Sequence, residues 1–376
     1  MVEANEQALK ESSLRDRHIE LGAHLKEYFG FQMAQSFSET LAEHKAVRVN
    51  AGLIDLSFGG CLKIWGGEAV QFLNGLVSND VKTLGVGKGM PAAFLTGHGK
   101  VRALCRVLNI GTEFLVTNDP QTHAKVYGYV APFSNAGDFK VEDVSQKYRL
   151  LSVQGPKSQL VMKEICFEPV PSLDENDWFE TLIAGHRALV VRASHTGEAG
   201  YDIFVSEPAL ADVWDFILLK GQFYSLIPVG LDALESLRVE AGIPVYGVDV
   251  DETNMLLETG LADTVSFSKG CYTGQEAVAM ATYRGHVSKK LSGLLLSGDA
   301  AVPVRGDTVK KDGKEIGYVT SALRSPSIDS VIALAYIKYG FFEIGNNLEV
   351  NTTSGALPAT IAKLPFLEAL SPLHRK

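Results

Sequence analysis

The sequence predicts a mixed α+β region up to about residue 285, followed by a separate all-β domain of the size of a small barrel. The length of 376 residues exceeds what one hydrophobic core usually organises, so more than one domain is expected. Helix-like and strand-like patterns alternate before residue 285. After it, the chain contains only short strand-like runs separated by turn residues.

The first half of the α+β region begins with a segment that reads as helical. The first 45 residues are rich in Glu, Lys, Leu and Ala, and short strands and the helix-like run "GEAVQFLNGLVSNDV" follow. The runs "GKVRALCRVL" and "EFLVTN" are separated by "NIGT", which has the composition of a hairpin turn. The G-x-G-x-G pattern in "TLGVGKGM" follows a helix instead of a strand, so we expect a loop there and not a phosphate-binding site.

The second half repeats the strand and helix patterns. "YRLLSVQGPKSQLVMKEI" reads as a strand followed by a helix, and "HTGEAG" supplies turn residues between two β-rich runs. "LDALESLRVEA" lies between Pro228 and Gly242, which are typical helix start and stop residues. In the all-β part, the Asp-Gly pair of "DTVKKDGKEIGYVTSA" predicts the tip of a hairpin.

The composition excludes several classes of function. The net charge of −9 gives no reason to expect a nucleic-acid partner, because that binding depends on basic patches. No apolar run approaches the roughly 18 residues of a membrane span, so no membrane partner is expected. The N-terminal segment mixes acids with bases and lacks an apolar core, unlike a secretory signal, so a cytoplasmic location is expected.

The cysteines and histidines show no metal-ligand spacing, so no metal site is expected. The four cysteines are scattered without C-x-x-C pairs and should be reduced thiols: Cys61, Cys105, Cys166 and Cys271. Three histidines stand alone in Gly-rich turns, where a solvent-facing side chain is more common than a ligand: His98, His195 and His286.

The motif "KGCYTGQE" places Cys271 just before a predicted helix, "GQEAVAMATY". Thr273 and Glu276 have the spacing of a capping box at the start of this helix. The helix terminus and Lys269 would both favour the thiolate form of Cys271. A buried, unreactive cysteine is the alternative interpretation, since cysteine is often buried. Local sequence does not separate the two.

Three further polar residues are candidates for a binding site. Arg238 lies on the apolar stripe of its predicted helix and must find an anion there, for which Glu235 is the nearest choice. Glu198 lies in a predicted hairpin turn and Asn118 at a strand end. From the residue pattern alone, Glu198 and Asn118 are interpreted as surface residues.

Several segments together resemble the folate-binding fold of the glycine-cleavage T-protein, the aminomethyltransferase, from about residue 40 to 365. They are "AGLIDLS", "FLNGLVSNDV", "HTGEAGYDIFV", "PVGLDALESLRVEAG", "GYVTSALRSP" and "ALAYI". The resemblance implies three subdomains around a central folate channel, the last a C-terminal β-barrel. It also implies domains at 1–285, built from two intertwined subdomains (approximately 1–50 with 147–260, and 51–146 with 261–285), and at 286–376 for the barrel.

The resemblance also implies roles for individual residues. Glu198 matches the glutamate that hydrogen-bonds the pterin, Asn118 matches an asparagine beside the pterin, and Arg238 matches an arginine of "LRxEAG". The implied cofactor is tetrahydrofolate or a one-carbon derivative. Aminomethyltransferases usually carry acidic residues where this chain has Ala103 and Leu104, one of them facing the folate nitrogen that receives the one-carbon unit. This departure speaks against aminomethyl transfer, because the acid/base group is missing.

The motif "KGCYTGQE" is similar to the signature of the YgfZ-type folate-binding proteins, which are associated with iron–sulfur cluster maintenance. The expected function is therefore a tetrahydrofolate-binding accessory protein in iron–sulfur cluster assembly or repair. Its functional thiol would be Cys271, with Lys269 beside it, and iron–sulfur proteins or assembly factors would be possible partners. A true aminomethyltransferase is the alternative. A binding module without chemistry is a third, and it would keep Glu198 but have no use for Cys271.

Overall fold

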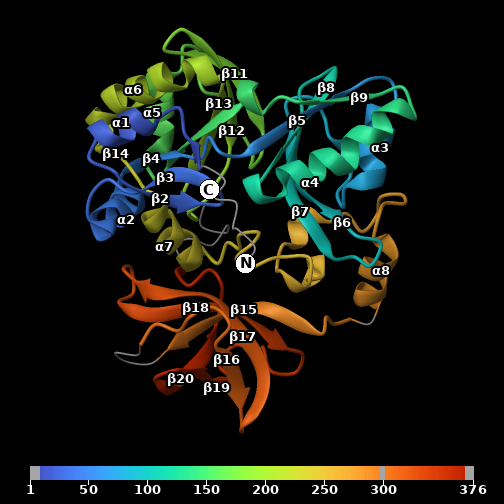
Figure 1. Cartoon of the computed structure of the whole chain (residues 1–376), viewed down its shortest axis with the longest axis vertical. Helices are drawn as coiled ribbons and strands as arrows, with labels where there is room; N and C mark the ends of the chain where they lie inside the picture. The colour runs from blue at the N-terminus through green and yellow to red at the C-terminus, as the bar shows by residue number, and fades with distance from the viewer. Residues whose placement is uncertain (1–8, 284, 297–300, 369–376) are drawn as a thin grey trace, which may run out of the picture.

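The computed structural model describes residues 9–283, 285–296 and 301–368, which form three lobes (Figure 1). The first lobe contains a six-stranded sheet, the second a five-stranded sheet, and the third a closed barrel of six strands. A mixed α+β fold that ends in a C-terminal barrel is therefore confirmed. Within the described ranges, no helix is long and apolar enough to cross a membrane.

The six-stranded sheet of the first lobe has the order β11-β12-β13-β10-β4-β14. Neighbouring strands are antiparallel except for β4 and β14, which are parallel. The strands are β4 (Ala51–Asp55), β10 (Arg149–Gln154), β11 (Trp178–Ile183), β12 (His186–Arg192), β13 (Gly200–Val205) and β14 (Leu226–Pro228). The chain leaves this sheet after β4, forms the strands of the second lobe, and returns to it at β10. The expected domain boundaries stay a prediction.

Helices cover both faces of this sheet. On one face, α5 (Ser158–Ile165) and α6 (Leu210–Gly221) pack through residues such as Met162 and Trp214. On the other face, α2 (Thr40–Val49) and α7 (Leu231–Ala241) pack through Val47 and Leu237. The helix predicted between Pro228 and Gly242 is confirmed, and Gly242 ends it with a φ of 70°.

The prediction that the first 45 residues are helical is wrong for their middle part. A short helix, α1 (Arg15–Glu20), is followed by a hairpin of β2 (His24–Tyr28) and β3 (Phe31–Ser36), and β1 (Lys10–Glu11) pairs with β3. Phe29 and Gly30 form the hairpin tip with φ values of 49° and 82°. The composition of this segment favours a helix, but these two residues favour the turn. Residues 1–8 lie outside the described ranges.

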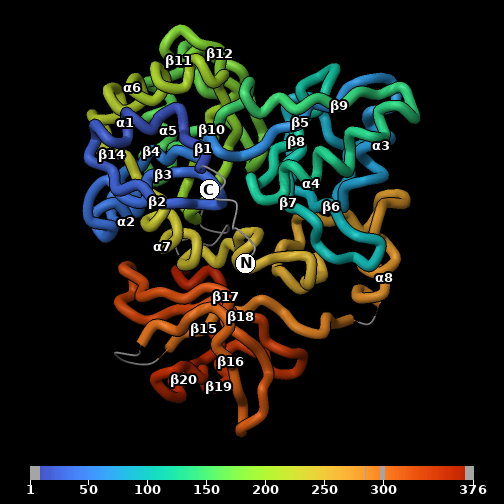
Figure 2. Tube along the Cα trace, in the orientation of Figure 1, coloured from blue at the N-terminus to red at the C-terminus, as the bar shows by residue number. Residues whose placement is uncertain are grey.

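The five-stranded sheet of the second lobe has the order β6-β7-β8-β5-β9. The strands are β5 (Gly60–Trp65), β6 (Gly89–Leu95), β7 (Val101–Asn109), β8 (Glu113–Asn118) and β9 (Lys140–Asp143). The predicted hairpin of β7 and β8 is confirmed. Helices α3 (Ala69–Leu76) and α4 (Pro120–Val130) share one apolar cluster with the sheet. After α7, the chain runs along β6 and β7 to α8 (Gln275–Tyr283) (Figure 2). This segment, β6, β7 and α8 together form a second apolar cluster.

The barrel of the third lobe has the order β15-β18-β17-β16-β19-β20. Its strands are β15 (Lys289–Leu296), β16 (Thr308–Lys311), β17 (Lys314–Ser325), β18 (Ser330–Lys338), β19 (Asn347–Thr352) and β20 (Gly355–Ala362). Helix α7 lies between the first lobe and the barrel (Figure 1), where Val239 packs against Leu334 and Tyr336. The residues of α7 therefore contact both lobes.

Candidate functional site

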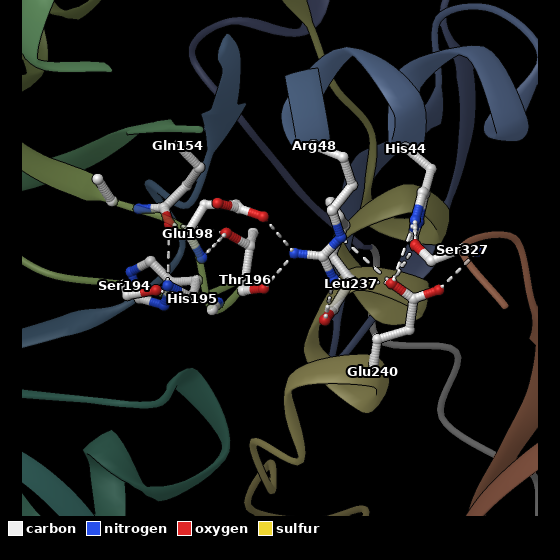
Figure 3. A network of polar contacts seen from close by, with 12 residues as sticks. His44, Arg48, Gln154, Ser194, His195, Thr196, Glu198, Leu237, Glu240 and Ser327 are labelled. Atoms are coloured by element: carbon white, nitrogen blue, oxygen red, sulfur yellow. Dashed lines mark hydrogen bonds and ion pairs between the residues drawn. The ribbon is translucent and has the colours of Figure 1, made fainter. Parts of the chain in front are cut away.

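A polar network centred on Arg48 joins the end of α2, the loop between β12 and β13, and α7 (Figure 3). Arg48 Nε and Nη2 donate to Glu240 Oε2 at 3.2 and 2.8 Å, and Nη2 also donates to the carbonyl oxygen of Leu237 at 3.2 Å. Nη1 donates to the carbonyl oxygen of Thr196 at 2.8 Å and to Glu198 Oε1 at 3.1 Å. A guanidinium has five N–H groups, and all five are used here. Arg48 therefore fixes three elements relative to one another.

Glu240 is the buried anion that holds Arg48. Its side chain is fully buried, its Oε2 also accepts from Ser327 Oγ at 2.8 Å, and His44 Nε2 lies 3.3 Å away. Burial alone would raise the pKa of Glu240, but hydrogen bonds from His44, Ser325 and Arg48 outweigh burial and lower the pKa to about 2. Glu240 therefore stays ionised at neutral pH and keeps Arg48 in place.

Glu198 lies at the accessible end of this network, in the turn "HTGEAG" (Figure 3). The turn is fixed by the positive φ of Gly197 and by the Glu198 backbone N–H, which donates to Thr196 Oγ1 at 3.2 Å. Arg48 holds Glu198 Oε1, while Oε2 has no hydrogen-bond partner in the described ranges, and the side chain is 20% exposed. Glu198 is therefore half-buried and oriented, not a free surface residue, with one oxygen left to bind a ligand.

His195, in the same turn, was interpreted as solvent-facing; its side chain is 28% exposed, and its ring is paired with a carboxylate. Its Nε2 lies 2.8 Å from Oδ1 of Asp202, a fully buried carboxylate that also binds Arg106 Nη1 at 2.8 Å through Oδ2. Burial would raise the pKa of Asp202, but the positive charges of His195 and Arg106 hold it well below its usual range. The local sequence does not reveal this pairing because Arg106 comes from the other lobe.

Asn118 ends β8 and is buried, with 8% exposure, so its interpretation as a surface residue is wrong. Its Oδ1 lies 3.1 Å from His123 Nδ1, and its Nδ2 has no partner in the described part of the chain. The His123 ring packs against Gly60, where a Cβ would lie 2.0 Å from Nδ1, so this position requires glycine. The amide nitrogen of Asn118 is a buried donor that still lacks an acceptor.

Asp119 follows Asn118 at the start of α4, but its carboxylate does not cap the helix. The side chain is only half-buried, yet desolvation raises its pKa to about 6, opposed by the charge of His195. The residue pattern did not single out Asp119. An Asp-Pro pair before a helix reads as an ordinary N-cap, so no signal distinguished it.

Arg238 does not serve the site as expected, because all of its donors are used elsewhere. Its Nε and Nη2 donate to the carboxylate of Glu235, which confirms the simpler of the two interpretations. Its Nη1 donates to Asp249 Oδ2 at 2.7 Å and to the carbonyl oxygen of Ile243 at 3.1 Å, and Nη2 also donates to Ser321 Oγ at 2.8 Å. With five donors satisfied, Arg238 joins α7 to the barrel and has none left for a ligand.

The motif "KGCYTGQE" separates into a buried lysine and an exposed cysteine. Lys269 Nζ donates to the carbonyl oxygens of Asn74, Val77 and Asn79 at 2.7 to 2.8 Å, so its three N–H groups are used at the end of α3. It therefore has no N–H left to donate to Cys271, which is exposed, and the expected effect of its charge on the thiol stays a prediction. Helix α8 begins at Gln275, close to where it was predicted, but the predicted capping box is absent from the described hydrogen bonds.

Ala103 and Leu104, on β7, are both in apolar surroundings. Ala103 is fully buried in the cluster beneath α3 and α4, and Leu104 packs in the cluster that contains Tyr246 and Leu256. Neither position offers a polar group to a ligand.

A hollow away from Glu198 and the arrangement of possible metal ligands are two further features of the structure. A hollow of about 600 Å³, lined by residues such as Glu168, His186 and Phe204, lies at the ends of β12 and β13 opposite to Glu198. In the described ranges, no group of three His, Cys, Asp or Glu side chains is arranged to hold a metal ion.

Comparison with known proteins identifies the family. The GCVT N-terminal domain matches residues 14–269, and the glycine cleavage T-protein C-terminal barrel domain matches residues 289–368. The chain is 31% identical over 360 residues to an aminomethyltransferase of Halothermothrix orenii, with 96% of this chain and 100% of the relative covered. It is 32% identical over 363 residues to an aminomethyltransferase of Caldanaerobacter subterraneus, with 95% and 96% covered.

The fold agrees with a solved structure. The crystal structure of glycine cleavage system aminomethyltransferase T from Bartonella henselae matches with a TM-score of 0.87 and 23% identity, covering 96% of this chain and 98% of that one. The names of the two relatives that are 31% and 32% identical favour the aminomethyltransferase alternative over the YgfZ type. On the matched domains and the full-length relatives, the chain belongs to the glycine cleavage T-protein family.

Proposed function

We propose that this chain binds tetrahydrofolate, or a one-carbon derivative of it, at the site around Glu198 and transfers a one-carbon unit as aminomethyltransferases do. Relatives that are 31% and 32% identical over almost the whole chain carry that name, which supports this activity. The observation that carries the binding proposal is the Glu198 carboxylate, held by Arg48 through one oxygen and free at the other.

The residues present fit the pterin of tetrahydrofolate. The pterin amino group and ring N–H are adjacent donors, and an oriented carboxylate such as Glu198 can accept from them. The unpartnered Nδ2 of Asn118 is a donor that lacks an acceptor, and the pterin also offers acceptors. When bound, tetrahydrofolate would supply the nitrogen atoms that receive the one-carbon unit.

Two measurements test this proposal. Calorimetric titration with tetrahydrofolate should show binding to the wild-type protein and a loss of roughly tenfold or more in Glu198→Gln, because a charge-assisted hydrogen bond is removed. Unchanged affinity in Glu198→Gln would reject the assignment of Glu198. Release of ammonia from an aminomethyl-lipoyl carrier protein, dependent on tetrahydrofolate, should occur if the chain is a transferase.

A second candidate is the YgfZ-type accessory function in iron–sulfur cluster assembly or repair. It is favoured by the exposed thiol of Cys271 within "KGCYTGQE" and by the apolar surroundings of Ala103 and Leu104, where transferases usually carry acids. It predicts folate binding without ammonia release. Deletion of the gene should then lower the activity of several iron–sulfur enzymes, and Cys271→Ser should fail to restore them. Full restoration by Cys271→Ser would remove this candidate.

A further inference from the structure

The carboxylate of Asp119 is half-buried and has no hydrogen-bond partner among the described residues. Asp119 lies at the junction of β8 and α4 and makes no capping hydrogen bond. Half-buried carboxylates elsewhere in the site, such as that of Glu198, are held by a cation. Asp119 differs from them in this respect.

Several other elements lie around the start of α4. Cys105 on β7 is the cross-strand partner of Asn118, and Gln121 Nε2 donates to the carbonyl oxygen of Tyr246, in the chain after α7, at 3.0 Å. Tyr28 on β2 and His195 in the turn between β12 and β13 interact with the charge of Asp119. These elements belong to both of the first two lobes and to the segment that returns after α7. Asp119 therefore lies where separate parts of the fold meet.

An unpartnered, desolvated carboxylate destabilises the folded state, because a charge loses its water without gaining a partner. Such a group is expected at positions that act on a ligand. The residue before it, Asn118, has a buried amide nitrogen without a partner, which is a second unsatisfied group at the same strand end. One donor and one acceptor therefore remain unused in consecutive residues.

Asp119 is also close to the position that lacks an acid in this chain. Leu104 packs in one cluster with Tyr246 and precedes Cys105, which is the cross-strand partner of Asn118, the residue before Asp119. A carboxylate is therefore present near the apolar side chain of Leu104, but it comes from the end of β8 instead of from β7.

We propose that Asp119 is a ligand-contacting carboxylate of this site and that its oxygens accept hydrogen bonds from N–H groups of the bound reduced folate. The inference rests on the proposed function, since it takes tetrahydrofolate as the ligand. It adds Asp119, at the end of β8, as a second carboxylate that binds the ligand beside Glu198 in the turn between β12 and β13.

The test is a calorimetric titration of the full-length protein with tetrahydrofolate, comparing the wild type with Asp119→Asn. The substitution keeps the size of the side chain but removes its charge, and we expect a loss of affinity of roughly tenfold or more. The matched control is Asp174→Asn, which changes the same chemical group at a side chain that is 93% exposed and should leave the affinity unchanged. Thermal unfolding without ligand should show that Asp119→Asn is at least as stable as the wild type.

The outcomes separate the inference from the proposed function. If the wild type binds and Asp119→Asn binds equally well, the inference is rejected and the proposed function stands. A lower unfolding temperature for Asp119→Asn would show that the carboxylate supports the fold, which would also reject the inference. If the wild type does not bind tetrahydrofolate, both the proposed function and the inference are rejected.

Discussion

Replacing Arg48 by methionine should destabilise the protein and also weaken ligand binding. The substitution removes five hydrogen bonds, among them the two to buried Glu240 and the one that orients Glu198. Breaking a buried ion pair by removing one partner typically costs about 3–5 kcal/mol. Glu240 keeps hydrogen bonds from Ser325 and Ser327, so we expect the lower end of this range, about 3 kcal/mol.

The matched control is Arg238→Met. Arg238, on α7, is buried and, like Arg48, uses five donors, and its partner Asp249 keeps hydrogen bonds from Thr320 and Ser321. Urea unfolding should therefore show a similar loss of stability for both variants. Calorimetry with tetrahydrofolate should show that affinity falls by about tenfold in Arg48→Met, where Glu198 is no longer oriented, and changes little in Arg238→Met.

Two results would contradict this reasoning. If Arg48→Met loses less than about 1 kcal/mol, the network does not stabilise the junction of α2 and α7. If both variants lose affinity equally, then loss of stability explains the effect and the orientation of Glu198 does not.

Three further predictions concern other residues. Asp119→Asn should raise the free energy of unfolding by about 1–3 kcal/mol at pH 7.5, because burial raises the pKa of Asp119 from 3.8 to about 6 and the ionised form penalises the folded state. This gain should vanish near pH 4, where the carboxyl group is largely protonated in the folded protein. Denaturation at both pH values measures the difference, and a loss of stability at pH 7.5 would contradict the prediction. Iodoacetamide should label exposed Cys271 well before buried Cys105, as followed by peptide mass spectrometry, and equal rates would contradict the exposure of Cys271. Lys269→Met should lower the urea midpoint by an amount equivalent to about 2–4 kcal/mol, because three carbonyl groups lose their donor, and an unchanged midpoint would show that water replaces the ammonium group.

Patterns that depend on neighbouring residues predicted much of the fold. The β7–β8 hairpin, the helix that ends at Gly242 and the all-β C-terminal part all follow from turn residues and periodicity. The hairpin of β2 and β3 was missed because its Glu, Lys and Leu content is also typical of helices, and only Phe29 and Gly30 mark the turn.

The site was less predictable because its contacts join distant parts of the chain. Glu198 was selected by resemblance, but Arg48, which orients it, is 150 residues away, and the bond from Arg48 to Glu240 spans 192 residues. A local pattern contains no information on such pairs. The same limit explains why Arg238 was expected to bind a ligand, since its bond to Ser321 spans 83 residues.

The position of α7 limits how far the barrel can be exchanged as a module. Four hydroxyl groups of the barrel, those of Thr320, Ser321, Ser325 and Ser327, bind anions that belong to α7 or to the segment just after it. A chimera that takes its barrel from a distant relative would preserve the site only if the donor barrel offers hydroxyls at these four places. Substitutions in the barrel and in α7 are therefore expected to be inherited together.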